Sequence, residues 1–272
     1  MIKTILVPIC HQQGADERIE CAIDLANKFD AHIQALHILT PLETMVSSIH
    51  ADFARSIEVY SQFQKDVELE AEKLKEKYVT KLEHAGVRFD WCQEKGDLLD
   101  HLYIYSRASD LTILSQKDDS FDDILDYTND FIIGSGLPVL VIPKKYEKTF
   151  EANNIIVAWD GSRESAKVTH DALPLLKAAN KVTVLTVSEN NKEQVPGADI
   201  CIHLARHGVI AEALTITEEN PSDQIILNAA NNIDADLIVA GAWGHKRLQE
   251  IVFGGVTKTL ISNQKKALFL AH

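Results

Sequence analysis

The chain has 272 residues, 46% of them hydrophobic, which is long for one globular domain and sufficient for the cores of two. Its formal net charge of −13 argues against broad nucleic-acid binding, because a phosphate backbone would repel it. No apolar run is long enough to span a membrane, and the start of the chain lacks a secretory cleavage site, so a cytoplasmic protein is expected. The four cysteines show no CxxC or disulfide-like spacing, as expected where thiols stay reduced.

The first half of the chain alternates apolar strand patterns with helical ones. Its expected strands are residues 3–10, 31–39, 88–93, 110–115 and 139–143, and its expected helices include 19–29 and 97–109. A long helical run at 47–84 is rich in charge, for which a solvated helix is the favoured interpretation and a partner-binding helix the minority one.

The second half repeats this order some 150 residues later. Its expected strands are residues 153–160, 181–188, 210–216, 236–241 and 267–271, and its expected helices include 165–179, 221–233 and 256–263. Strands that alternate with helices imply right-handed parallel crossovers, and uniformly apolar strands imply a sheet covered on both faces. The sequence therefore predicts two doubly wound α/β domains, each with a mainly parallel five-stranded sheet and helices on both faces. The polar segment 144–154 is the expected linker, which places the domains at 1–146 and 147–272.

A glycine-rich stretch, 241–257, follows the fourth strand of the second half directly. Gly241 and Gly244 allow the backbone to turn tightly and to approach a ligand closely. Gly254 and Gly255 lead into a helix whose free N–H groups would suit an anion such as phosphate. Thr257 could add a hydroxyl donor there. Positive charge could come from a cluster before the helix: His245, Lys246 and Arg247.

A second polar element follows the first strand of this half, at the edge of the sheet where α/β proteins bind ligands. Asp160 could accept hydrogen bonds from a base or a ribose, and Gly161 and Ser162 turn into the next helix. Taken alone, helix capping is the better interpretation of Asp160 and Ser162. Glycines alone are equally a weak signal, since they mark ordinary turns. Together at neighbouring strand ends they favour a ligand site.

The combination resembles the universal stress protein family in its tandem form. The first strands and Asp160 match, as do Gly241, Gly244 and Gly254, which reproduce the spacing of the family's nucleotide signature. The resemblance implies a bacterial-type stress-response protein that binds ATP or ADP with Mg²⁺ in its second domain. It places Asp160 at the adenine, Gly241 and Gly244 at the ribose and phosphates, and the phosphates on Gly254 with its neighbours Gly255, Val256 and Thr257. His245 could add positive charge at that site. By position, Val157, Ala158 and Val187 could line the base pocket.

Two departures from the family pattern concern the phosphate site. Gly255 stands where the family has serine or threonine after the third glycine, and the hydroxyl moves to Thr257. Asn220 stands where a glycine is common before the fourth helix, although asparagine also tolerates left-handed conformations.

The first half departs further, because Cys10 and His11 stand where the second half has Asp160 and Gly161. Its segment after the fourth strand is acidic and would repel a triphosphate. We expect a degenerate copy without ATP that pairs with the second domain within the chain. A different ligand in the first half, an unidentified protein partner and a homodimer all stay open.

Three classes of protein compete on this evidence. A nucleotide-dependent regulatory switch without efficient chemistry is favoured, with slow ATP hydrolysis or self-phosphorylation as an accompaniment. The others are an enzyme of related architecture and a scaffold or small-ligand binder in which the loop glycines only form turns. The phosphate loops of an adenylating synthetase or a dehydrogenase are missing after the first strand. No catalytic residue is predicted, because no pair of metal ligands at a diagnostic spacing stands near the glycine-rich stretch.

Two histidines could bind a metal. His203 and His207 are four residues apart on an expected helix, a spacing that suits zinc. The sequence offers no third ligand, so surface or capping roles are favoured and the metal content is left open.

Overall fold

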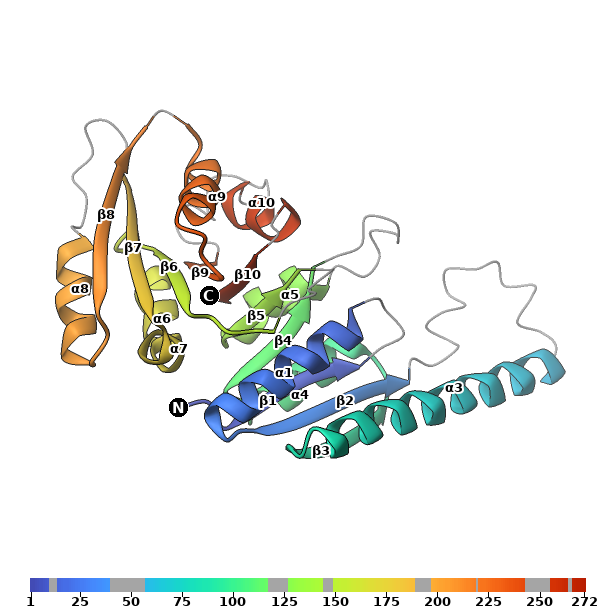
Figure 1. Cartoon of the computed structure of the whole chain (residues 1–272). Coiled ribbons are helices and arrows are strands. Elements are labelled where there is room, and N and C mark those ends of the chain that lie inside the picture. Colours follow the sequence, from blue (N-terminus) through green and yellow to red (C-terminus); the bar gives the residue numbers. More distant parts are fainter. Residues whose placement is uncertain are drawn as a thin grey trace.

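The computed structural model describes a chain of two similar halves (Figure 1). The described residues are 1–9, 14–39, 57–116, 127–143, 149–188, 197–218, 220–242, 255–263 and 266–272. The strands of the first half are β1 (Thr4–Ile9), β2 (His32–Leu39), β3 (Arg88–Lys95), β4 (Leu111–Ser115) and β5 (Val139–Ile142). Its described helices are α1 (Ala15–Phe29), α3 (Ile57–His84), α4 (Leu98–Ser106) and α5 (Tyr127–Ser135).

The second half repeats the pattern. Its strands are β6 (Asn154–Ala158), β7 (Lys181–Ser188), β8 (Ala211–Thr217), β9 (Leu237–Gly241) and β10 (Ala267–Ala271). Its described helices are α6 (Arg163–Asp171), α7 (Leu173–Ala178), α8 (Gly197–Arg206), α9 (Ser222–Asn232) and α10 (Gly255–Asn263).

The strands form one ten-stranded sheet with the order β3-β2-β1-β4-β5-β10-β9-β6-β7-β8. Within each half all neighbouring strands are parallel, which confirms two doubly wound α/β units. Between the halves, β5 and β10 pair antiparallel, with Leu140 opposite Phe269. The sheet is therefore continuous across the two halves.

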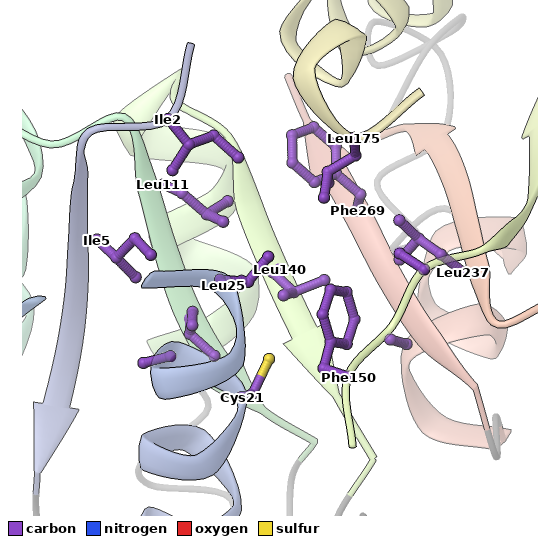
Figure 2. Packing of buried hydrophobic residues seen from close by; sticks show 14 of the residues in the cluster. Ile2, Ile5, Cys21, Leu25, Leu111, Leu140, Phe150, Leu175, Leu237 and Phe269 are labelled. Atoms are coloured by element: carbon purple, nitrogen blue, oxygen red, sulfur yellow. The ribbon is translucent and has the colours of Figure 1, made fainter. Parts of the chain in front are cut away.

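Helices cover both faces of this sheet. Buried residues of α1, α3, α6, α7 and α8 form a core on one face, and those of α4, α5, α9 and α10 form a core on the other. Figure 2 shows part of the first core, where Leu140 and Phe269 of the paired strands lie between Leu111 of the first half and Leu175 and Leu237 of the second.

Two expectations about helices and linker differ from the structure. The predicted helix 165–179 is divided into α6 and α7, because Pro174 has no N–H to donate and its ring clashes with a continuing helix. The expected linker is polar in composition, but one of its residues packs into the core. Phe150 is buried, and its N–H donates to the carboxylate of Asp24 on α1 at 2.7 Å.

The helix α3 confirms the expectation of a solvated helix over its described side chains, since only Ala71, Tyr78 and Leu82 are buried. In Figure 1 it runs beside β2 and β3 and extends beyond them. The earlier part of the predicted run, 47–56, lies outside the described residues.

Candidate functional site

The candidate site lies where β6 and β9 end side by side. These two strands are parallel neighbours, with Ala158 opposite Ala240. The chain leaves β6 toward β7 on one side, whereas β9 continues toward β10 on the other. Such a reversal opens a crevice at the carboxyl ends of the strands, which is where doubly wound proteins bind their ligands. Asp160 follows β6, and Gly241 ends β9, so the fold brings both residues to the mouth, the crevice at the carboxyl ends of β6 and β9.

The turn after β6 is built by its own polar side chains. The carboxylate of Asp160 accepts from the Ser162 N–H at 2.9 Å, and Gly161 takes the left-handed conformation at φ 73°. Ser162 caps α6, since its hydroxyl accepts from the Ser165 N–H at 3.1 Å. The capping interpretation is thus correct for Ser162, whereas Asp160 shapes the turn and remains exposed to solvent.

Gly241 lies against the first turn of α6. A Cβ at this position would lie 2.8 Å from both the carbonyl carbon of Glu164 and the amide nitrogen of Ser165. Because the neighbouring atoms belong to the backbone, they cannot move aside cheaply. The glycine is therefore required by helix–strand packing, whatever else its backbone contacts.

The residues predicted to line a base pocket lie on different faces of the sheet. Ala158 and Val187 are partly buried and pack with the core beneath α9 and α10. Val157 is fully buried in the core on the opposite face, under α6, because successive side chains of a strand alternate. The structure therefore does not bring the Val157 side chain to the mouth.

The helix α10 begins at Gly255, one residue before the expected start at Val256. It connects the parallel strands β9 and β10, so its first turn lies at the carboxyl ends of the strands. There Val256 is exposed, whereas Thr257 is only 6% exposed and turns toward the protein. The contact of the Thr257 hydroxyl with a phosphate therefore stays a prediction, as does the use of the backbone N–H groups of this first turn as anion donors. The predicted residues Gly244, His245 and Gly254 lie outside the described residues.

Sequence reasoning missed two residues at this edge. His272 follows β10, and its Nδ1 lies 2.9 Å from the carbonyl oxygen of Ala242, to which it donates. Glu164 is 7% exposed and pairs with Arg163 at 2.7 Å. Burial acts to raise the pKa of Glu164, but its own backbone N–H, Arg163 and His272 outweigh burial and lower it. The sequence around His272 carries no motif. Its place at this edge follows from the pairing of β10 with β9, which brings His272 to Ala242.

The corresponding mouth of the first half is filled by a buried arginine. Arg18 is 1% exposed, and it donates to the Pro8 carbonyl oxygen at 3.1 Å and to the Ser115 hydroxyl at 2.8 Å. Ser115 ends β4 as Gly241 ends β9, and Arg18 stands four residues after its helix cap as Ala166 does in α6. The first half thus holds two polar side chains where the second has a glycine and an alanine.

A groove of ≈ 660 Å³ lies at the other end of α6. Its lining includes Ile2 and Pro138 of the first half and His170, Leu173 and Pro174 of the second. Because Asp160 and Gly241 adjoin the first turn of α6, this groove is a separate feature from the mouth.

No group of three or more His, Cys, Asp or Glu side chains could hold a metal ion among the residues that the structure describes. Over the same residues, no helix is long and apolar enough to cross a membrane.

The fold and this mouth define a tandem protein of two doubly wound α/β units. Residues 198–272 match the family model of the Universal stress protein family. The chain is also 28% identical over 153 residues to the stress response protein NhaX of Bacillus subtilis (strain 168), an alignment that covers 41% of this chain and 92% of that protein. These matches confirm the resemblance to the universal stress protein family.

Solved structures extend the likeness to both halves. A universal stress protein from Archaeoglobus fulgidus DSM 4304 aligns with a TM-score of 0.77 at 17% identity, covering 98% of this chain and 97% of that one. A functionally unknown protein from Pseudomonas aeruginosa PAO1 aligns with a TM-score of 0.59 at 17% identity, covering 99% and 92%. At such identity the alignments show the fold.

Proposed function

We propose that this protein is a stress-response switch that binds an adenine nucleotide, ATP or ADP with Mg²⁺, in its C-terminal domain, residues 147–272. One observation carries the proposal: the reversal of strand order between β6 and β9 gathers an exposed carboxylate, an apolar surface and a helix N-terminus at one edge. The carboxylate suits hydrogen-bond donors of the ribose or the base, the apolar surface suits the adenine ring, and the helix N-terminus suits the phosphates.

Each part has a separate role in this proposal. The exposed Asp160 carboxylate accepts hydrogen bonds from the adenine side or the ribose, and Ala158 and Val187 supply apolar contact. The first turn of α10 donates its backbone N–H groups to the phosphates. The loop residues Gly244, His245 and Gly254 complete the phosphate site, and Mg²⁺ enters bound mainly to phosphate oxygens.

The N-terminal domain, residues 1–146, binds no ATP in this proposal and serves as the partner of the nucleotide-binding one. Arg18 and Ser115 support this, because their side chains fill the space at the ends of β1 and β4. The domains meet through β5 and β10.

One observation favours the alternative of a scaffold without nucleotide. Gly241 is explained by the packing of α6 alone, so this part of the glycine pattern does not require a ligand. A slow ATPase is the remaining variant, since bound ATP and a nearby side chain such as His272 could support weak hydrolysis.

Calorimetric titration with ATP and Mg²⁺ tests the proposal. We expect one site per chain in the natural protein and a loss of affinity of at least about tenfold in Asp160→Ala, as for a removed charge-assisted hydrogen bond. Asp160→Asn keeps an oxygen for the Ser162 N–H but loses the charge, so it separates binding from turn formation. Ser162→Ala removes only the helix cap and is the matched control, with affinity unchanged. If protein that has been freed of nucleotide binds no ATP, the proposal is wrong and the alternative of a scaffold without nucleotide is favoured.

A further inference from the structure

Three histidines form a continuous row between two helices of the second half. His170 lies in the last turn of α6, His203 lies in the last turn of α8, and His207 follows the end of α8 directly. The ring centroids of His170 and His203 are 4.9 Å apart, and those of His203 and His207 are 4.7 Å apart. The i, i+4 pair could be found in the sequence, whereas the third ring is supplied by a helix more than thirty residues earlier.

The surroundings of the central imidazole, His203, disfavour its protonated form. Nε2 of His203 is buried and has no hydrogen-bond partner among the described residues. Burial, followed by the neighbouring His170 and His207 and by Arg206, lowers the pKa of His203. No carboxylate is among the groups that act on it.

The groups beside the row on α6 and α8 also disfavour an added proton. Nδ1 of His170 donates to the Ala166 carbonyl oxygen at 2.7 Å, so the neutral ring carries its proton on that nitrogen. The nearest acid on α6, Asp171, is paired with Lys167 at 2.6 Å. On α8 the charged group that acts on His203 is cationic Arg206, whereas the acid of this helix, Asp199, lies in its first turn. A proton added to the row therefore meets positive charge and other imidazoles on both sides.

We propose that the row of His170, His203 and His207 is a proton-sensitive contact between α6 and α8, which packs closely when neutral and weakens when it becomes protonated. Histidine is the side chain whose ordinary pKa puts this change near neutral pH. Two imidazolium rings at such separations repel each other, and the buried His203 nitrogen has nothing to receive the new N–H. The contact belongs to the C-terminal half and does not depend on bound nucleotide.

The sign of the pH effect follows from the lowered pKa. The unfolded chain takes up a proton on His203 near pH 6.5, whereas the folded chain resists it until a lower pH. The contribution of the neutral row to stability is therefore fully present above about pH 6.5 and is lost as the pH falls through the folded pKa. Acidification should weaken the second half in this window.

Two measurements on the full chain in the presence of EDTA test the proposal. The first is titration of the histidine ring signals by NMR, in which His203 should titrate below the ordinary histidine range and move toward it in His170→Gln. The second is the melting temperature from pH 8 to pH 5.5. It should fall by about 2–4 °C more for the natural protein than for His203→Gln.

His84→Gln is the matched control, because His84 is exposed near the end of α3 and outside the row. It should follow the natural protein throughout. A His203 that titrates in the ordinary range, or equal pH profiles for His203→Gln and the natural protein, would overturn the proposal. So would a pH dependence that appears only when Zn²⁺ replaces EDTA, since the row would then be a metal site.

Discussion

Asp110 and Asp236 make the same pair of hydrogen bonds in the two halves. The carboxylate of Asp110 accepts from the backbone N–H groups of Lys3 and Thr4 at 2.6 and 2.9 Å. That of Asp236 accepts from those of Asn153 and Asn154, both at 2.9 Å. Each aspartate precedes its fourth strand and ties the start of the first strand to it, so the repeat extends to individual contacts.

The two aspartates make equivalent hydrogen bonds, but we expect their replacement by alanine to lower the free energy of unfolding by different amounts. Asp236 is partly buried, whereas Asp110 is exposed, so water can readily replace only the hydrogen bonds of the Asp110 carboxylate. Asp236→Ala should lower the free energy of unfolding by about 1–3 kcal/mol, and Asp110→Ala by about 0.5–1.5 kcal/mol. Urea denaturation measures both. The asparagine variants keep an acceptor oxygen and serve as controls; equal losses in all four would mean that charge, and not the hydrogen bonds, matters.

Gly241 is predicted to be a packing residue first. Gly241→Ala places a Cβ about 2.8 Å from the backbone of Glu164 and Ser165, so α6 must shift, at a cost of about 1–3 kcal/mol. Thermal denaturation without nucleotide measures it. Gly197→Ala is the control, because the nearest atoms to its Cβ all belong to side chains: the Thr186 hydroxyl at 3.1 Å, Val184 at 3.5 Å and Ala213 at 3.7 Å. If Gly241→Ala melts like the natural protein but loses nucleotide, its role lies with the ligand.

Much of this fold could be predicted from the sequence, because the two halves supply the same alternation of apolar strands and helices. The position of Asp160 follows from local signals of a strand end, and the start of α10 follows from local helix signals to within one residue. What stayed hidden depends on long-range pairing. The antiparallel contact of β5 with β10 and the approach of His170 to His203 join segments whose sequences carry no mark of each other.

Local sequence patterns also could not predict which of these side chains point into the core. Val157 and Ala158 are both small apolar residues of one strand, and only the sheet face separates the core residue from the one near the mouth. Thr257 is buried because the helix face toward the core includes it, although its type suggests a ligand contact.

Arg18 should be structural in the first half. Arg18→Ala removes a buried side chain and leaves the Pro8 carbonyl oxygen and the Ser115 hydroxyl without this donor, which should cost about 2–5 kcal/mol. Circular dichroism during urea denaturation measures the loss. Arg88→Ala is the control, since Arg88 and its partner Asp30 are both exposed and the substitution should change stability by less than about 1 kcal/mol. Equal small losses would show that the cluster at β1 and β4 carries little stability.

The long helix α3 should be held by its apolar residues and only lightly by its ion pairs. Leu82 is fully buried, so Leu82→Ala should cost about 2–5 kcal/mol. Lys77 pairs with Asp16 of α1 at 2.8 Å, but both side chains are about half exposed, so Lys77→Ala should cost less than about 1 kcal/mol. Urea denaturation at pH 7 compares the two, and a larger loss for Lys77→Ala would reverse the ranking.

The ion pair should nevertheless be visible at acidic pH. Burial acts to raise the pKa of Asp16, but the hydrogen bond and charge of Lys77 outweigh it, so the pKa is lowered. The unfolded chain takes up this proton near pH 3.9, and the pair's contribution is lost as the pH falls further, through the folded pKa. Above about pH 5 the difference between the natural protein and Lys77→Ala should therefore stay constant, and below pH 4 it should shrink. Urea denaturation across this range measures it; a difference that shrinks already between pH 7 and 5 would place the responsible group elsewhere.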